Sequence, residues 1–479
     1  MRLIILFCIL MQIIPLEVFS QSEHIESLDK ENIIGFEFQL DNDESKKVSI
    51  DLKGMLGIQY NYINPLDNRE YLVGYDENKS EGTRYFLQPN NRKPKYNSNF
   101  AIRRARIGMD IKMPYDIYMH IMFALDLGQN QTSYGVNRDY IDYGYFGKKF
   151  DHGLLEGRLE LGYRKVYFGV EEHTPPFKIK NIERSIANNY FNQATNWTEE
   201  GRPPGYVCTP LGIGNRHTGL YWDGKLNKAL QGLKYYLAIT SEAFDPFRKS
   251  RGSEVSRMYY YFGLGYDNSW ENKSLNFGLN YALIPQGVAY FPIEEQRYSR
   301  LSALNPYLEA KWDGLRVFGE AFFGEASKGQ FIDGGFTDNQ APDRALNAPT
   351  AYSTGYTIIA SYLTRSGIEP VLRYSNLDTG GAGFSSGFIR DIIPNEPSRL
   401  ETSNFNKAHQ LNATVNYQVI ENHLRFSVGY EYIQLKENID YKIFINNNDT
   451  QVPNSEAQQL IDDSKYEMHI VRARMQFYF

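Results

Sequence analysis

Basic side chains occupy alternate positions in several segments of this sequence, and the positions between them are apolar. Arg104 and Arg106, for example, alternate with Ala105 and Ile107. Guanidinium groups present planar forks of N–H donors that match the oxygens of carboxylates and phosphates. A row of them on one surface can therefore guide or bind anions. The basic residues with this placement are Arg104, Arg106, Lys112, Arg158, Arg164, Arg316, Arg373, Arg425, Arg472 and Arg474.

Acidic residues share the same polar faces, among them Asp51, Glu160, Glu309 and Glu431. Two interpretations follow. Either the arginines remain uncompensated and favour anions, or each one pairs with a carboxylate on a neighbouring strand. The sequence leaves both open.

A period of two recurs along almost the whole chain. From Val48 to Tyr62, aliphatic and aromatic residues fall on one face, and Ser, Asp, Lys, Gln and Asn fall on the other. Side chains of a β-strand alternate between faces. Several such runs last about ten residues, the length that a tilted strand needs to cross a bilayer. Strands of soluble proteins are usually about five or six residues long.

The alternation predicts about sixteen antiparallel strands that close into a transmembrane β-barrel. We expect them near residues 48–62, 99–113, 115–128, 139–147, 156–169, 215–225, 231–241, 255–267, 273–284, 300–313, 314–326, 351–363, 367–376, 407–420, 422–436 and 464–479.

The connections support a barrel. Long links, such as 63–98, 170–214 and 377–406, mostly alternate with short ones, such as Glu421-Asn422-His423. Long extracellular loops and short periplasmic turns are typical of bacterial outer-membrane barrels. In that geometry apolar side chains meet lipid and the basic rows line the lumen.

The ends of the chain indicate export. Residues 1–20 combine Arg2 with an apolar run and resemble a signal peptide. We expect 21–47 to be a periplasmic extension and 48–479 to be the barrel, with Phe479 as a terminal signal for the barrel-assembly machinery. The two cysteines, Cys8 and Cys208, leave only one after cleavage, so no internal disulfide is expected. The net charge of −6 disfavours nucleic-acid binding, and no metal site or cofactor is indicated.

The connection 170–214 follows the fifth predicted strand and is the third of the expected extracellular loops. Its basic residues Lys178, Lys180 and Arg184, together with Tyr190 and Phe191, predict a loop that folds into the lumen and narrows it. An ordinary surface loop is the alternative.

Three segments resemble a known family. Phe100 to Asp110, FAIRRARIGMD, is similar to the F-x-hydrophobic-R-R-A-R strand of the phosphate-selective porin O/P family. Gly162 to Gly169, GYRKVYFG, followed by Glu171, resembles its G-x-x-K-x-P-F-G-x-E segment, with Tyr167 where the family often has proline. Asn181 to Arg184 looks like the stretch just beyond. The resemblance implies a sixteen-stranded, usually trimeric anion channel.

The function expected is therefore passive diffusion of small hydrophilic solutes across the bacterial outer membrane, with a preference for anions such as phosphate. A substrate-specific channel for larger nutrients such as oligosaccharides is the alternative, because the aromatic loops 285–300 and 182–191 could stack against sugars. An enzyme is not expected: the chain has 8 His, and neither His120 nor His217 lies in a nucleophile motif.

Overall fold

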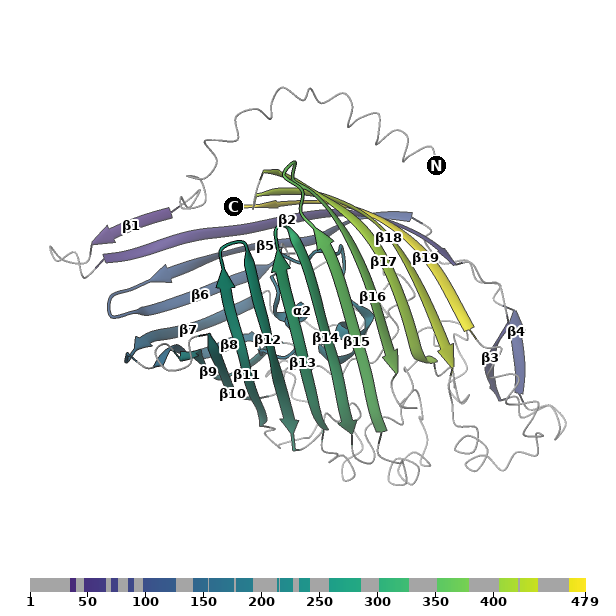
Figure 1. The fold of residues 1–479 in the computed structure, drawn as a ribbon, viewed down its shortest axis with the longest axis horizontal. Helices are drawn as coiled ribbons and strands as arrows, with labels where there is room; N and C mark the ends of the chain where they lie inside the picture. The colour runs from purple at the N-terminus through teal and green to yellow at the C-terminus, as the bar shows by residue number, and fades with distance from the viewer. Residues whose placement is uncertain are drawn as a thin grey trace.

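The computed structural model describes residues 35–39, 47–65, 70–75, 85–89, 98–125, 141–153, 155–175, 178–192, 213–214, 216–226, 232–241, 258–285, 301–326, 351–378, 405–420, 423–437 and 465–479. Almost all of them lie in β-strands, which wrap around a common axis (Figure 1). No helix in these ranges is long and apolar enough to span a bilayer.

The strands form one closed antiparallel ring. The ring strands are β2 (Lys47–Pro65), β5 (Ser98–Lys112), β6 (Ile117–Ala124), β7 (Ile141–Asp151), β8 (Leu155–Lys165), β9 (Arg216–Leu226), β10 (Leu233–Thr240), β11 (Tyr259–Trp270), β12 (Lys273–Ile284), β13 (Leu301–Trp312), β14 (Leu315–Ala326), β15 (Ala351–Tyr362), β16 (Ile368–Asp378), β17 (Phe405–Ile420), β18 (Leu424–Glu437) and β19 (Lys465–Tyr478).

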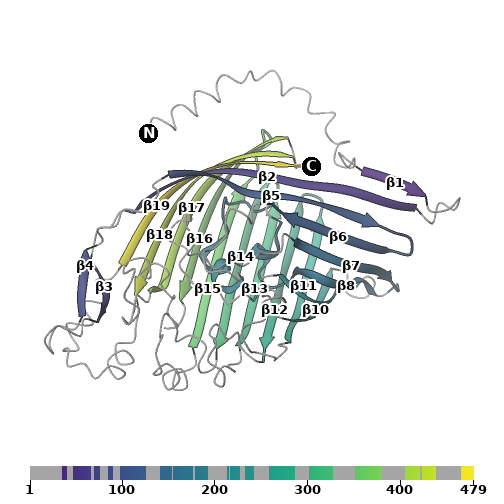
Figure 2. The same cartoon turned by 180° about the vertical axis from the view of Figure 1, so that it is seen from behind.

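Each ring strand pairs with its neighbour in chain order, and β19 pairs back onto β2. The sheet has seventeen strands, and one of them, β1 (Gly35–Gln39), lies outside the ring, which leaves sixteen. Seen from behind, β2 and β5–β8 form one wall and the later strands form the opposite one (Figure 2). The predicted sixteen-stranded antiparallel barrel is confirmed.

Three details differ from the expected strands. The fifth ring strand, β8, ends at Lys165 rather than near residue 169, because the chain turns into the barrel there. The segment expected as an unpatterned extension contains β1, which pairs with residues 47–51 of β2. The link expected as a plain loop after β2 contains a hairpin of β3 (Glu70–Tyr75) and β4 (Tyr85–Pro89).

The short connections have the backbone geometry that tight turns require. Between β13 and β14, Asp313 and Gly314 both have positive φ, 45° and 86°. Two positive φ values are characteristic of a type I′ hairpin turn, and Asp-Gly suits it. Apart from the connection between β8 and β9, most of each long connection lies outside the described residues.

The two faces of the wall match the predicted parity. Large apolar side chains point outward on every side of the ring, for example Leu264, Leu308 and Leu372, with Leu372 64% exposed. Polar and charged side chains such as Asn305, Glu369 and Arg472 point inward and are buried. An apolar outer band of this kind is stable only against lipid, so the exterior is the membrane-facing surface.

The described residues of the connection between β8 and β9 lie in the interior. Residues 166–192, called the lumenal loop from here on, include two short helices, α2 (Val170–His173) and α3 (Ile186–Asn192). Both lie inside the ring (Figures 1 and 2). All seven residues of α3 are buried, so this loop is packed as a core element rather than as a surface loop.

Candidate functional site

The lumenal loop enters the barrel through contacts with the far wall. Gly169, at the start of α2, has φ 83° and donates its backbone N–H to Asn305 on β13 at 3.1 Å. The N–H of Val170 donates to the Glu320 carboxylate on β14 at 2.8 Å. A carboxylate at a helix N-terminus satisfies N–H groups that have no partner within the helix. The first turn of α2 is therefore fixed to β13 and β14.

Apolar contacts hold α3 against the same wall. The ring of Phe191 stacks on Phe322 of β14, with centroids 4.9 Å apart and ring planes at 13°. Phe168 also contacts Phe322, at 6.0 Å between centroids. All three rings are fully buried. Aromatic pairs of this kind stabilise a packed core beyond the area they bury.

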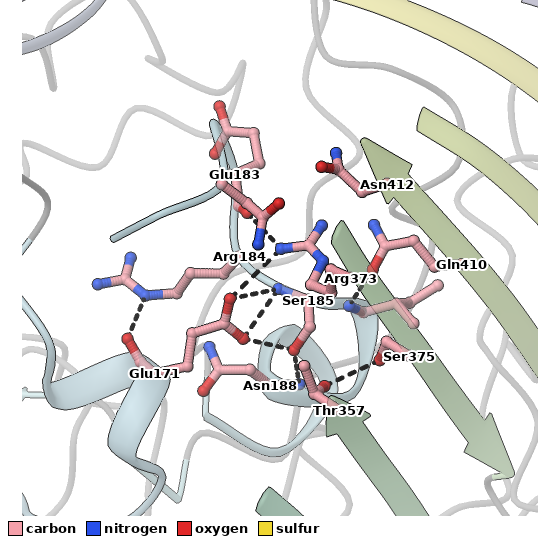
Figure 3. Close-up of polar contacts among 12 residues, drawn as sticks. Glu171, Glu183, Arg184, Ser185, Asn188, Thr357, Arg373, Ser375, Gln410 and Asn412 are labelled. Atoms are coloured by element: carbon pink, nitrogen blue, oxygen red, sulfur yellow. Dashed lines mark hydrogen bonds and ion pairs between the residues drawn. The ribbon is translucent and has the colours of Figure 1, made fainter. Parts of the chain in front are cut away.

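A polar network surrounds the start of α3 (Figure 3). The Ser185 N–H donates to the Glu171 carboxylate at 3.0 Å, and the Ser185 hydroxyl donates to it at 2.5 Å. The same hydroxyl accepts the Asn188 N–H at 3.2 Å, which makes Ser185 the N-cap of α3. Arg373 of β16 reaches Glu171 at 3.3 Å and the Glu183 carbonyl at 2.5 Å.

Two further wall residues accept from the helix backbone. The Ile186 N–H donates to Gln410 of β17 at 2.9 Å, and the Ala187 N–H donates to the Ser375 hydroxyl of β16 at 3.4 Å. These side chains point toward α3 in Figure 3. Backbone donors of α3 that have no helical partner are therefore satisfied by the barrel wall itself.

A second ionic cluster ties the loop to the end of β8. The Glu172 carboxylate contacts Lys165, accepts from Arg184 at 3.0 Å and accepts from the Asn188 amide at 3.0 Å. Burial by itself raises the pKa of Glu172. The charges of Arg184 and Lys165, with hydrogen bonds from Lys165 and Asn188, outweigh burial and lower that pKa to about 2. Glu172 is therefore ionised near neutral pH.

Glu183 is the loop's contact with the opposite wall. Arg103 of β5 donates to it twice, at 2.8 and 3.1 Å, and Gln59 of β2 donates at 3.2 Å. Burial raises its pKa, but Arg103, Arg472 and Arg474 overcome that effect and hold the pKa well below the usual range. The loop thus contacts β2 and β5 on one side and β13–β17 on the other, and it crosses the lumen.

Arg103 was not predicted as a lumenal residue. Gly57 of β2 pairs with Arg104 and Ile58 pairs with Ile102, which leaves Arg103 as the extra residue of a β-bulge in β5, so Arg103, Arg104 and Arg106 all belong to the inner face. The sequence contains an indication of this shift, because the apolar residues Phe100 and Ile102 are at even positions, whereas the apolar residues Ala105 and Ile107 are at odd positions. Lys165 and Arg216 were also missed, and the residues before Arg216 have no pattern that would have indicated it.

Most of the predicted basic residues have a carboxylate partner. Arg106 pairs with Asp142 at 2.9 Å, Arg158 with Asp223 at 2.9 Å and Lys112 with Asp51 at 2.9 Å. Contacts of the same kind join Arg164 to Glu160, Arg316 to Glu309, Arg373 to Glu171, Arg472 to Glu431, Lys180 to Glu369 and Arg184 to Glu172. Lys178 of the loop is exposed.

Three predicted arginines differ from the rest. Arg104, Arg425 and Arg474 are 8%, 6% and 3% exposed. Within the part of the chain that the structure describes, no carboxylate oxygen lies within 4.0 Å of their nitrogens. Both earlier interpretations of the basic rows therefore apply, each to a different subset.

The closed ring, the apolar exterior and the loop packed across the lumen define a transmembrane β-barrel of the porin class. Residues 84–202 match the model of a family described as phosphate-selective porin O and P. The match includes all three segments in which the resemblance was recognised, and it confirms that resemblance. The family match and the barrel indicate a channel rather than an enzyme, and they place the protein in the bacterial outer membrane.

Several solved structures align with most of this chain at low sequence identity. An anion-selective porin from Comamonas acidovorans aligns over 90% of this chain and 100% of its own, at 12% identity and a TM-score of 0.48. The outer-membrane channel DcaP of Acinetobacter baumannii aligns over 92% of this chain and 100% of its own, at 10% identity and a TM-score of 0.46. OmpF of Salmonella typhi aligns over 92% of this chain and 100% of its own, at 11% identity and a TM-score of 0.47. A search among curated proteins found no significant sequence match.

Proposed function

We propose that the protein is a passive channel for small hydrophilic solutes, that the lumenal loop narrows its lumen, and that it prefers anions. The observation that supports this preference is a local imbalance of charge at Glu183. This one carboxylate interacts with Arg103, Arg472 and Arg474, of which Arg472 also pairs with Glu431. Arg104 interacts in turn with Arg103, Arg184 and Arg474. Arginine remains protonated at any physiological pH, so the positive excess is permanent.

The physical effect of this excess follows from the low dielectric of the wall. Charges on a pore lined by protein and surrounded by lipid act over a longer range than charges in bulk water. A positive surface lowers the energy of an anion in the lumen and raises that of a cation. Rings of arginine and lysine produce anion selectivity in pores by this means.

A reversal potential in a potassium chloride gradient tests the proposal. For the purified protein in a planar bilayer, we expect chloride to permeate better than potassium. The double variant Arg104→Gln, Arg474→Gln should lower the chloride preference, because it removes two permanent positive charges without adding a negative one. Arg365→Gln, in the exposed turn between β15 and β16, is the matched control and should behave as wild type.

Clear cation selectivity of the wild-type channel would end the anion proposal and leave the channel itself intact. For a channel that prefers anions, comparing the permeabilities of chloride and phosphate in the same bilayer decides whether a tetrahedral oxyanion is favoured. A higher relative permeability for phosphate supports the phosphate preference that the family resemblance implies.

Uptake of a larger nutrient such as an oligosaccharide is the alternative. Sugar channels use exposed aromatic rings as stacking surfaces. Tyr190 and Phe191, two rings considered for that role, are buried at 2% and 0% exposure, and the other candidate loop, 285–300, lies largely outside the described residues. This reduces the support for the alternative. Block of conductance by one oligosaccharide would restore it.

We further propose that the mature chain begins after residue 20, that residues 21–47 form a periplasmic extension and 48–479 the barrel, and that the protein assembles as a homotrimer. A solved relative, OmpT of Vibrio cholerae, is described as a trimer. Mass spectrometry of the purified protein gives the N-terminus, and light scattering in detergent gives the number of chains. A monomeric particle that conducts would contradict the trimer.

A further inference from the structure

The outer surface of the barrel changes in character along strands β15 to β19, which lie side by side (Figures 1 and 2). The central part of their outer face is apolar, as at Leu372 of β16. Near the ends that lead into the long connections, the outer positions become polar. In the register of the sheet, Asn376 of β16 lies opposite His409 of β17, and the same lateral row continues through Gln434 of β18 to Glu467 of β19. A polar row thus crosses four strands beyond the apolar band.

One half of this polar surface, on β15 to β17, combines an amide, an imidazole and two phenol rings. The Asn376 amide donates to Nδ1 of His409 at 2.9 Å, and the Tyr374 hydroxyl lies 3.1 Å from the same nitrogen. The rings of Tyr374 and His409 are inclined by 28° with centroids 6.5 Å apart, and the Tyr356 ring lies 5.8 Å from that of Tyr374. All four side chains are at least partly exposed on the outer face.

The other half lies on β18 and β19. The Gln434 amide donates to the Glu467 carboxylate at 2.6 Å and to the Tyr432 hydroxyl at 3.3 Å. Tyr430 and Tyr432 both pack against the His469 ring, with centroids 5.7 and 5.2 Å away. A girdle of aromatic residues at the membrane interface accounts for the tyrosines, but not for the histidines, amides and carboxylate, which hydrocarbon cannot solvate. The two halves together are called the polar patch below.

The polar patch lies at the height of lipid headgroups. His409 is eleven residues from Ile420, where β17 reaches the short turn to β18. At about 3.3 Å per residue and a strand tilt of about 40°, that separation is roughly 28 Å along the barrel axis. The apolar band of such a barrel is about 25 Å tall. The patch therefore begins where the hydrocarbon region ends, on the side of the long connections.

A basic row follows beyond the patch. Lys407 of β17 lies opposite Lys436 of β18, and Lys436 lies opposite Lys465 of β19. On the other side, Lys407 is paired in register with Asp378 of β16 and contacts its carboxylate at 3.2 Å. Three lysines and one aspartate give this row an excess of positive charge. Along the strands, the sequence of layers is apolar, then hydrogen-bonding and aromatic, then basic.

We propose that the polar patch binds the headgroup of a phosphorylated glycolipid in the outer leaflet of the membrane. Acyl chains lie against the apolar band, sugars stack on the tyrosine rings and hydrogen-bond to the histidines and amides, and phosphates meet the lysine row. The three layers follow the order of such a lipid from acyl chain to phosphate, which favours a lipid over a second copy of this chain. The surface lies outside the lumen, so this inference goes beyond the proposed conduction.

Native mass spectrometry of the full mature chain in detergent tests the site, with diphosphorylated lipid A as the probe. We expect one lipid A per chain to bind, at lower concentrations than phosphatidylglycerol, which has a phosphate but no sugar. The double variant Asn376→Leu, His409→Leu should weaken lipid A binding about tenfold, because it removes two hydrogen-bonding side chains. Far-UV circular dichroism confirms that each variant retains its β-structure.

The matched control is Tyr260→Leu, Tyr281→Leu. It makes the same exchange of polar for apolar side chains on β11 and β12, near the ends that lead into long connections, and should bind lipid A as wild type does. Lys407→Gln separates the two layers of the site. It should weaken binding of diphosphorylated lipid A and leave binding of dephosphorylated lipid A nearly unchanged, because only the first ligand has phosphates for the lysine row.

Lipid A that binds wild-type protein no better than phosphatidylglycerol would overturn the site, as would a double variant that binds lipid A normally. Loss of an oligomer in the double variant, without lipid A binding to wild type, would assign the patch to a subunit interface and also overturn the proposal. Reversal potentials in bilayers without lipid A test conduction separately. Lipid A binding without anion selectivity refutes only the anion proposal, and selectivity without lipid A binding refutes only the glycolipid site.

Discussion

At the scale of single residues, the inner wall distinguishes paired from unpaired cations. Arg106 and Arg158 each face a carboxylate from the adjacent strand, which balances their charge and fixes their orientation. Arg104, Arg425 and Arg474 have no such partner among the described residues. Selectivity should therefore depend on a few arginines rather than on the total number of basic residues.

Arg373 is the residue whose loss should free the lumenal loop. Its side chain is 0% exposed and joins β16 to Glu171 and to the Glu183 carbonyl. Removing one partner of a buried ion pair typically costs about 3 kcal/mol or more. We expect Arg373→Met to lower the free energy of opening of residues 183–189 by roughly that amount, measured as hydrogen-exchange protection. Unchanged protection would show that the apolar contacts of Phe191 suffice.

Glu172 predicts how the loop responds to acid. Its folded pKa is about 2, below the ordinary value of 4.5. A lowered pKa stabilises the folded state fully above the unfolded pKa and progressively less as the pH falls toward the folded pKa. Protection factors of residues 180–192 should thus be constant down to about pH 5 and fall between there and about pH 2.

The control for this pH effect is Glu172→Gln. The variant cannot ionise, so its loop should be less protected near neutral pH and should show a smaller decrease on acidification. Glu183, whose pKa is also lowered, contributes a residual decrease. A wild-type loop that loses protection already above pH 5 would contradict this assignment.

At the scale of elements, the pairing of β5 depends on close backbone approach. A Cβ on Gly108 would lie 2.2 Å from the Ile121 carbonyl oxygen and 2.9 Å from Cα of Met122, both in the backbone of β6. These atoms cannot move without separating the two strands. Glycine at this position therefore allows the register in which Arg106 and Asp110 face the lumen.

We accordingly expect Gly108→Ala to impair assembly of the barrel, measured as the yield of folded protein in the outer membrane. Gly319→Ala on β14 is the matched control, because its Cβ would meet only the Thr357 carbonyl at an ordinary 3.8 Å. Equal yields for the two variants would show that β5 and β6 tolerate a wider separation.

At the scale of the whole molecule, the apolar exterior requires the folded barrel to lie in a lipid bilayer. Leu264 on β11 is 58% exposed and lies in the apolar band around the ring. An arginine near the bilayer midplane of a barrel costs about 2–4 kcal/mol. We expect Leu264→Arg to lower the free energy of unfolding in lipid by up to that amount, and Leu264→Phe to leave it nearly unchanged. Equal stabilities in urea titrations of liposome-reconstituted protein would place Leu264 outside the hydrocarbon region.

The sequence by itself determined the strands of the barrel wall and the two faces of each strand. Alternation at period two identifies each strand and its two faces, because the side-chain period of a strand is fixed by its backbone. The sixteen ring strands and the inward parity of Arg472 and Arg474 were predicted in this way, whereas the shift at Arg103 was missed. Local periodicity does not extend past Lys165, where the apolar residues of 166–192 have no strand pattern.

Only the tertiary structure decided which side chains of the inner face contact one another. Whether an arginine meets a carboxylate depends on register and on contacts between residues far apart in the chain, such as Arg373 with Glu171 and Arg103 with Glu183. The bulge at Arg103 and the path of the lumenal loop set those contacts. Closure of the ring brings β19 beside β2, and it thereby places Arg474 on the same inner face as Arg104 of β5.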